Sequence, residues 1–290
     1  MFSGTFTAMV TPFKGGRVDE AAFRKLIRFG IDGGVSGFLP CGTTGESPAL
    51  SHEEHNRVIE LTVKEVAGQV KVLAGTGSNS TEEAIALTRH AKAVGADAAL
   101  MVSPYYNKPT QEGLYLHFKA VADAVDIPIL VYNIQGRTAV NIENQTMERL
   151  AGISNIVGVK EASGSILQMS EVIRRCGSGF DVLSGDDQMT FPLMALGGKG
   201  VISVVTNIAP EKMSSLVNTM LAGEIDKARA MHFEIFELCQ AMFLETNPIP
   251  VKAALGLMGK IEPEFRLPLC PPSQANLGKL KTVLEKYGIL

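Results

Sequence analysis

The chain alternates short apolar runs with amphipathic segments along most of its length. Eight such runs are rich in small and β-branched residues, and amphipathic segments with helical spacing lie between them. They cover residues 5–13, 35–41, 70–77, 98–105, 127–133, 156–163, 180–185 and 200–206. Strands that alternate with helices favour a parallel sheet, because parallel neighbours need a long crossover between them. This alternation therefore places the chain in the α/β class.

Helix-start signals agree with this pattern. Ser51 is followed three residues later by Glu54, which is the sequence pattern of a capping box, and Thr81 and Thr110 open the next two amphipathic segments similarly. Eight repeats predict a (β/α)8 TIM barrel. An open doubly wound sheet is the second choice, since it usually has fewer strands and a glycine-rich nucleotide turn after the first strand, which is missing here.

The last part of the chain has only helical patterns. They cover residues 211–221, 224–243, 251–258 and 273–287. A barrel needs a single closing helix after its eighth strand, so the remaining helices form an appendage. We therefore predict a (β/α)8 barrel that carries the active site in residues 1–222 and a C-terminal helical domain in residues 223–290.

Composition narrows the class of protein. With 290 residues, 46% of them hydrophobic, the chain can bury a large core. A net charge of −3 with both signs interspersed gives no reason to expect a nucleic-acid or membrane partner. No signal peptide and no run of transmembrane length is evident. The four scattered cysteines are interpreted as reduced core thiols, which favours a cytoplasmic protein.

The run at 156–163 carries Lys160 at the end of what we expect to be a buried strand. Burial of an ammonium group is costly, so Lys160 either turns outward, pairs with Glu161 or loses its proton. A desolvated lysine has a lowered pKa, and its free amine can add to a ketone to form a Schiff base.

Polar residues also end other runs, and in a barrel these ends would meet at one mouth. Gly42-Thr43-Thr44-Gly45 is either a tight turn or a site where amide groups hold a carboxylate. Tyr132 is either a core residue or a proton donor and acceptor. Arg137 is either a solvated loop residue or a ligand of a substrate carboxylate. For Asp186 and Asp187 we favour helix capping.

Taken together, these motifs resemble the dihydrodipicolinate synthase family, over essentially the whole chain. The matching segments are Gly-Thr-Thr-Gly-Glu-Ser at 42–47, Ser-Pro-Tyr-Tyr-Asn-Lys-Pro at 103–109, Tyr-Asn at 132–133 with Arg-Thr at 137–138, Gly-Val-Lys-Glu-Ala at 158–162, Ser-Gly-Asp-Asp at 184–187 and Asn-Pro-Ile-Pro-Val-Lys at 247–252. The wider family includes N-acetylneuraminate lyase and other 2-keto acid aldolases. Arg137 and the paired threonines favour the synthases. The chain departs from the family at Gln135-Gly136, where a proline usually precedes the arginine, and glycine loosens the backbone there.

The resemblance implies a reaction and a role for each matching residue. Lys160 would form an imine with pyruvate, and the derived enamine would attack the aldehyde of L-aspartate 4-semialdehyde, giving 4-hydroxy-tetrahydrodipicolinate. Tyr132, Thr43 and Tyr106 would relay protons, with Tyr106 donated by a neighbouring subunit. Substrate binding would fall to Thr44, Arg137, Ile202 and Gly185. No metal or organic cofactor is implied, and the chain would form a homo-oligomer, at least a dimer and by resemblance a tetramer.

A second set of residues matches the site at which lysine-inhibited family members bind L-lysine. The set is Ser47, Pro48, His52, His55, Asn79, Glu83 and Tyr105. His52 and His55 are three residues apart and would share a helix face, and Glu83 could pair with a ligand ammonium. The alternative is a solvated helix face beside a buried tyrosine. Feedback inhibition by L-lysine in lysine biosynthesis is the implied function. His90, His117 and His232 are expected to be structural or surface residues.

The sequence leaves three alternatives to this function. One is another pyruvate-dependent aldolase acting on a sugar acid, against which Arg137 and the paired threonines argue. Another is a catalytically silent barrel that only binds small molecules, although the whole proton relay is present. A phosphate-binding barrel is weakest, because the glycine-rich stretch at 197–200 precedes the eighth run instead of following it.

Overall fold

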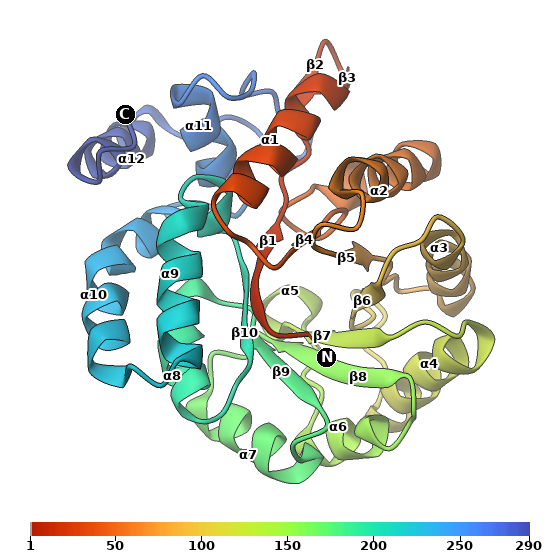
Figure 1. The fold of residues 1–290 in the computed structure, drawn as a ribbon. Helices are drawn as coiled ribbons and strands as arrows, with labels where there is room; N and C mark the ends of the chain where they lie inside the picture. The colour runs from red at the N-terminus through yellow and green to blue at the C-terminus, as the bar shows by residue number, and fades with distance from the viewer. Residues whose placement is uncertain (1) are drawn as a thin grey trace.

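Eight parallel strands close into a barrel in the computed structural model, which describes residues 2–290 (Figure 1). The strands are β1 (Gly4–Ala8), β4 (Gly37–Leu39), β5 (Lys71–Gly75), β6 (Ala98–Val102), β7 (Ile129–Asn133), β8 (Ile156–Glu161), β9 (Asp181–Ser184) and β10 (Gly200–Ser203). They neighbour one another in chain order, and β1 closes the barrel by pairing with both β10 and β4. The predicted (β/α)8 fold is confirmed.

The first predicted run was too long. The chain leaves the barrel after β1, and Phe13 belongs instead to a short antiparallel hairpin of β2 (Phe13–Lys14) and β3 (Arg17–Val18). Pro12 lacks the amide hydrogen that a central strand needs, and the glycines at 15 and 16 have positive φ, which suits a tight two-residue hairpin turn.

Helices surround the strands as a ring (Figure 1). The ring consists of α1 (Glu20–Asp32), α2 (His52–Val66), α3 (Thr81–Ala93), α4 (Gln111–Ala124), α6 (Asn144–Ala151), α7 (Ile166–Cys176), α8 (Thr190–Ala195) and α9 (Pro210–Leu221). Short segments at the strand ends are α5 (Gln135–Thr138), η1 (Ser47–Ala49), η2 (Asp187–Met189) and η3 (Val205–Asn207). The capping box of Ser51 and Glu54 is present, and Thr110 caps α4. Helix α3 is capped by Ser80, one residue before the predicted Thr81.

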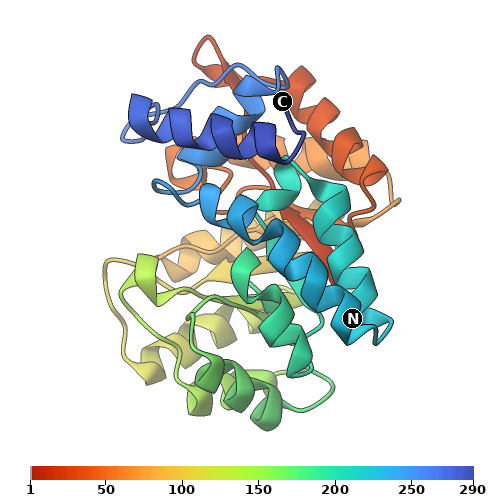
Figure 2. The ribbon, with the colours of Figure 1, turned by 90° about the vertical axis from the view of Figure 1, so that its left-hand side faces the viewer.

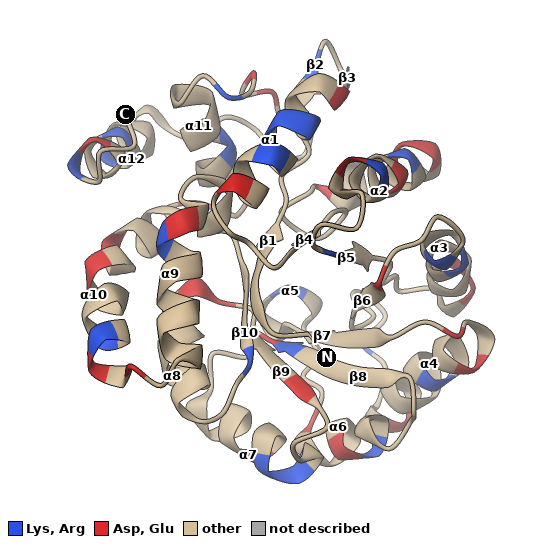
Figure 3. Cartoon of the chain, in the orientation of Figure 1, with Lys and Arg blue, Asp and Glu red and all other residues tan. Residues whose placement is uncertain are grey.

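Buried side chains form two layers, one inside the barrel and one between the strands and the helices, because successive side chains of a strand point to opposite faces. One set points to the barrel axis and includes Phe6, Leu73 and Leu183. The other set packs between strands and helices. Charged residues of both signs lie mainly on the outer helices (Figure 3).

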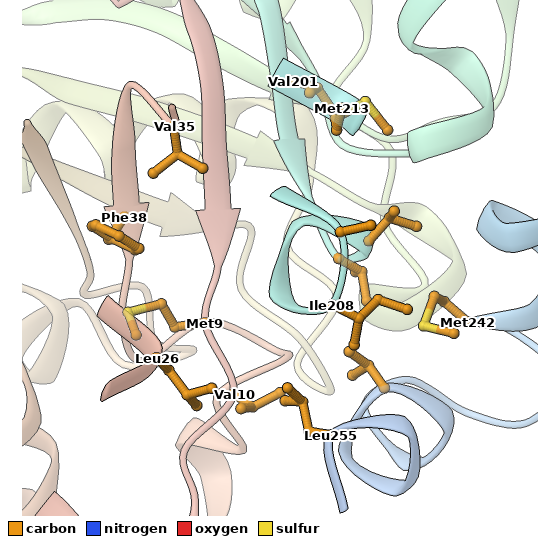
Figure 4. Close-up of a cluster of buried hydrophobic side chains, with 14 of the residues drawn as sticks. Met9, Val10, Leu26, Val35, Phe38, Val201, Ile208, Met213, Met242 and Leu255 are labelled. Atoms are coloured by element: carbon orange, nitrogen blue, oxygen red, sulfur yellow. The ribbon is translucent and has the colours of Figure 1, made fainter. Parts of the chain in front are cut away.

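The C-terminal helices α10 (Ile225–Ala241), α11 (Ile249–Leu257) and α12 (Gln274–Lys286) lie beside α9 and α1, away from the middle repeats (Figures 1 and 2). Leu255 of α11 and Met242, just after α10, belong to the same apolar cluster as Val10 and Ile208 of the barrel part (Figure 4). The appendage therefore shares a core with the barrel. The division at residues 222 and 223 stays a prediction.

No helix within residues 2–290 is both long enough and apolar enough to cross a bilayer.

All four cysteines are free, and Cys41 and Cys239 are buried. Cys176 is half-buried and Cys270 is exposed, so the prediction of core thiols was wrong for Cys270, which lies on an irregular segment before α12 where no helix covers it.

A buried ion pair fastens the appendage to the barrel mouth. Lys252 of α11 contacts Glu46, and their side chains are 0% and 1% exposed. The ammonium also lies 4.3 Å from the ring centroid of Phe13. Glu46 accepts a second hydrogen bond from the main-chain N–H of Arg266. Removing one member of such a pair leaves a buried charge without its partner, which is more costly than never having had the pair.

We expect Lys252→Met to lower the free energy of unfolding by about 3–5 kcal/mol, because Glu46 then stays buried without its counter-ion. Adding Glu46→Gln should recover part of this loss. Urea unfolding curves measure both. Lys14→Met is a control, since it removes a pair whose side chains are 64% and 54% exposed, and its midpoint should match the wild type. A single Lys252 variant as stable as the wild type would contradict the assignment.

Candidate active site

Lys160 lies inside the barrel near its C-terminal mouth. It pairs in register with Tyr132 on β7 and with Leu183 on β9, both of which point to the interior. The residue is 5% exposed, and its Nζ lies 4.2 Å from the ring centroid of Tyr132. The predicted burial of this lysine is confirmed, and the outward-turned alternative is wrong.

The surroundings of Lys160 favour the neutral amine. Burial lowers its pKa to about 7, while the negative charge of Asp187 acts in the opposite direction and the positive charge of Arg137 lowers it further. Roughly half of the side chains are then uncharged at neutral pH. Pairing with Glu161 does not occur, because adjacent strand residues face opposite sides. Glu161 accepts hydrogen bonds from the amides of Ser163 and Asn133 behind the barrel wall.

Gly185 gives Lys160 the room for this position. A Cβ atom at residue 185 would lie 3.1 Å from both Cγ and Cε of Lys160 and 2.7 Å from Cβ of Ala162. All three contacts are closer than side chains tolerate without a shift. Glycine at 185 therefore lets the Lys160 side chain take this position, and the substrate contact that the resemblance gives Gly185 stays a prediction.

Tyr132 and Thr43 form a pair next to Lys160. Burial raises the pKa of the Tyr132 phenol to about 12, opposed by the charge of Arg137 and by a hydrogen bond with Thr43. The phenol therefore keeps its proton at neutral pH. Thr43 comes from the loop after β4 and Tyr132 from β7, so barrel closure brings them together.

Arg137 lies on α5, directly after β7. Its Nη2 donates to the main-chain oxygen of Asn247 at 3.0 Å, and the side-chain Nδ2 of Asn247 donates to Oγ1 of Thr44 at 3.0 Å. Gly136 has no neighbouring atom within 4 Å of a potential Cβ, so a larger residue would fit there. Ile202 on β10 is buried in the barrel interior. Sequence reasoning had assigned no role to Asn247, although it belongs to a matching motif.

The two aspartates after β9 differ. Asp186 accepts from the N–H of Gln188 and caps η2, as predicted. Asp187 does not cap the following helix. It is buried and accepts from the main-chain N–H groups of Val204 and Val205, which tie β9 to β10. Burial raises the pKa of Asp187 to about 6, and its charge favours the protonated form of Lys160.

Tyr106 does not join this group within the chain. The residue is 91% exposed and has a φ of 72°, in the loop after β6. That left-handed backbone is uncommon for a tyrosine, and the exposure places its side chain outside the chain's own barrel core. The exposure fits the predicted contribution to a neighbouring subunit, which stays a prediction.

A cavity of about 570 Å³ opens at the barrel mouth. Its lining includes Thr43, Tyr132, Arg137 and Asn247, and it extends to most residues of the predicted L-lysine site. The members of that site in the lining are Ser47, Pro48, His52, His55, Glu83 and Tyr105. The remaining member, Asn79, is outside the lining, and its carbonyl accepts from Asn107. The other histidines, His90, His117 and His232, do not line the cavity.

Polar contacts connect side chains at the far end of this cavity, which His52, His55 and Glu83 line. Glu83 lies 2.7 Å from Nε2 of His52 and also accepts from Ser78, and these contacts lower the pKa of Glu83. Burial lowers the pKa of His55 to about 4, so its imidazole is neutral. His52 and His55 share one face of α2, as their spacing predicted. Across the part of the chain that is described, no cluster of three His, Cys, Asp or Glu side chains could hold a metal ion.

The sequence and the fold both match known proteins. A sequence model described as the Dihydrodipicolinate synthetase family matches residues 1–287. A 4-hydroxy-tetrahydrodipicolinate synthase of Syntrophus aciditrophicus is 59% identical over 290 residues, covering 100% of both chains.

Solved structures agree with these matches. The chloride-inhibited dihydrodipicolinate synthase of Acinetobacter baumannii, complexed with pyruvate, has a TM-score of 0.98 at 45% identity and is covered over 100% of both chains. The enzyme of Cyanidioschyzon merolae with lysine bound has a TM-score of 0.96 at 39% identity, covering 100% of this chain and 99% of that one. The fold and the sequence matches together show an enzyme of the lyase class. The chain belongs to the dihydrodipicolinate synthetase family.

Proposed function

We propose that this protein condenses pyruvate with L-aspartate 4-semialdehyde to give 4-hydroxy-tetrahydrodipicolinate, a step of lysine biosynthesis. The observation that carries the proposal is the position of Lys160. A partly uncharged amine lies at the end of a barrel strand, against the ring of Tyr132 and close to a cavity that small substrates can enter. Membership of the family supports the choice of reaction.

The neutral amine of Lys160 attacks the ketone carbon of pyruvate, and the carbinolamine loses water to give the imine. Loss of a proton from the pyruvate methyl group then gives an enamine, because the imine accepts the electron pair. The enamine carbon attacks the aldehyde, whose oxygen takes a proton to become the hydroxyl group. The substrate amine finally attacks the imine carbon, closes the ring and releases Lys160.

Neighbouring groups supply protons and hold the substrates. Tyr132 keeps its proton at neutral pH and, with Thr43, donates to and accepts from the carbinolamine oxygen. Thr44, Ile202 and Gly185 bind the pyruvate end, and the absence of a side chain at Gly185 leaves space for the Lys160 side chain. The guanidinium of Arg137, at the cavity wall, binds the carboxylate of the semialdehyde. An aldolase whose acceptor is a neutral sugar aldehyde would have no second carboxylate for Arg137 to bind.

Trapping tests the nucleophile. Pyruvate with borohydride should add one reduced pyruvyl group to the wild type, and Lys160→Arg should show none by intact mass. The free amine is the reacting form, so the trapping rate should rise with pH around a pKa of about 7 and level off above it. Lys199→Arg is a matched control on a lysine directly before β10, at the opposite end of the barrel from Lys160, and should trap normally. An adduct on Lys160→Arg would refute the assignment.

The exposed Tyr106 leads to a second part of the proposal. We infer that Tyr106 completes the proton relay of a neighbouring subunit, so that the active unit is at least a dimer and, as the family resemblance suggests, a tetramer. The phenol is 91% exposed on a left-handed loop residue, and no hydrogen bond from another described residue holds it.

Mixed subunits test this inference. Tyr106→Phe and Lys160→Ala chains should each be nearly inactive alone, with Tyr106→Phe losing roughly 10²–10⁴-fold in kcat. When the two chains are co-expressed, one site of each hybrid pair combines an intact Lys160 with an intact Tyr106, and activity should return. Absence of recovery in purified hybrids would place Tyr106 outside the neighbour's site.

Feedback inhibition is the third part of the proposal. We infer that L-lysine binds at the end of the cavity lined by His52, His55 and Glu83. Glu83 provides a carboxylate for a ligand ammonium, and neutral His55 has an unpartnered buried Nδ1 among the described residues. A lysine-bound structure of a family member supports the choice of ligand.

Saturating L-lysine should lower the initial rate of the wild type with pyruvate and the semialdehyde. Glu83→Gln should weaken inhibition by roughly tenfold or more, because the ligand ammonium loses its counter-charge, while the uninhibited rate changes little. Glu82→Gln is the matched control on the adjacent residue, which lies outside the cavity lining. Unchanged rates at saturating lysine would contradict the inference.

A further inference from the structure

Asn247 joins the C-terminal helices to Arg137 in the cavity lining and to the buried Thr44, two of the residues proposed to bind substrate. Its main-chain oxygen accepts from Arg137, and its Nδ2 donates to Thr44, each at 3.0 Å. It lies shortly before α11, more than 100 residues from Arg137 and more than 200 from Thr44 along the chain. The appendage thus places one residue between the groups proposed to bind the two substrates.

One polar atom of this residue has no partner. Oδ1 of Asn247 is buried and accepts no hydrogen bond from any described residue, although Asn247 lines the cavity and is only 6% exposed. A buried acceptor without a donor costs free energy, and such groups in folded proteins usually have a partner. The partner of this oxygen is therefore expected to enter with a ligand, as an N–H or O–H donor.

The charges of the cavity lining show which donor is suitable. Neither of its two carboxylates lies beside Arg137: Glu46 pairs with Lys252, and Glu83 stands with His52 and Ser78 at the far end of the cavity. An amino group held beside Arg137 therefore meets no free carboxylate among the lining residues. Oδ1 of Asn247 is the unpartnered acceptor on the very residue that Arg137 contacts.

We propose that Oδ1 of Asn247 accepts a hydrogen bond from the α-amino group of the amino-acid aldehyde while Arg137 binds its α-carboxylate. This inference rests on the proposed function and names the residue that selects an α-amino acid over its desamino analogue. Amino and carboxylate groups share one carbon atom, so their protein partners must be neighbours. Asn247 and Arg137 meet that condition through their direct contact.

A neutral amide suits the later chemistry better than a carboxylate. The amine must lose its proton before it can attack the imine carbon and close the ring. A carboxylate would stabilise the ammonium form and raise its pKa, whereas an amide oxygen orients either form without adding charge. Asn247 thus positions the amine without holding it protonated.

The test compares an amino substrate with its desamino analogue. In Asn247→Leu the main-chain oxygen that Arg137 contacts is kept, and only the side-chain amide is lost. We measure kcat/KM for L-aspartate 4-semialdehyde and the inhibition constant of succinic semialdehyde, which has the same aldehyde and carboxylate but no amine. The first should fall roughly tenfold or more, and the second should change far less.

Thr44→Val is the matched control, because it removes the same Asn247–Thr44 hydrogen bond from its other end. It should alter pyruvate saturation and leave the ratio between amino substrate and analogue as in the wild type. Equal weakening of both ligands in Asn247→Leu would overturn the proposal and leave Asn247 with a positioning role only. Asn247→Ala gives the same comparison if the leucine variant does not fold.

Failure of the proposed function has a different signature. In that case the wild type itself forms no borohydride-trapped pyruvyl adduct or does not consume the semialdehyde. Where the wild type does both, the ratio measured on the Asn247 variants bears on this inference alone.

Discussion

Desolvation of one lysine is the constraint around which this barrel is arranged. Lys160 is buried at the end of β8, and the low polarity of the barrel interior brings its pKa to about 7. The buried carboxylate of Asp187 limits that shift, and Gly185 leaves the side chain the space it needs. A free amine is nucleophilic and an ammonium is not, so this balance between burial and a nearby charge decides whether the site can react at neutral pH.

The C-terminal segment contributes directly to the candidate active site. Its helices share the apolar cluster of the first and last barrel repeats, and the buried pair of Lys252 and Glu46 fixes α11 at the mouth. From that position Asn247 contacts Arg137 and Thr44. The segment that carries Arg137 lacks the proline found in the family, which gives its backbone more freedom. The hydrogen bond from the Arg137 guanidinium to the main-chain oxygen of Asn247 offsets that freedom. The same cavity continues to His52 and Glu83, which gives a ligand bound there a direct route to influence the reacting groups.

Much of the fold could be predicted from the sequence because local pattern and burial agree. Parallel strands buried on both faces appear as continuous apolar runs, and the helix caps at Ser51 and Thr110 follow from local hydrogen bonding. The ends of the elements were less certain. The predicted run at 5–13 extends past the end of β1 because apolar residues of the hairpin share its composition. The sequence position of Asp187 suits a helix cap, although its side chain accepts from the main chain after β10.

The sequence by itself determined the barrel, its eight strands and the residues placed at their C-terminal ends, because period and polarity are local properties of a chain. It also identified Lys160, Tyr132 and Thr43 as candidates. Only the tertiary structure decided that Asp187 opposes the desolvation of Lys160 and that Asn247 holds Arg137 and Thr44. These relations join residues far apart in the chain, and barrel closure and helix packing set their distances.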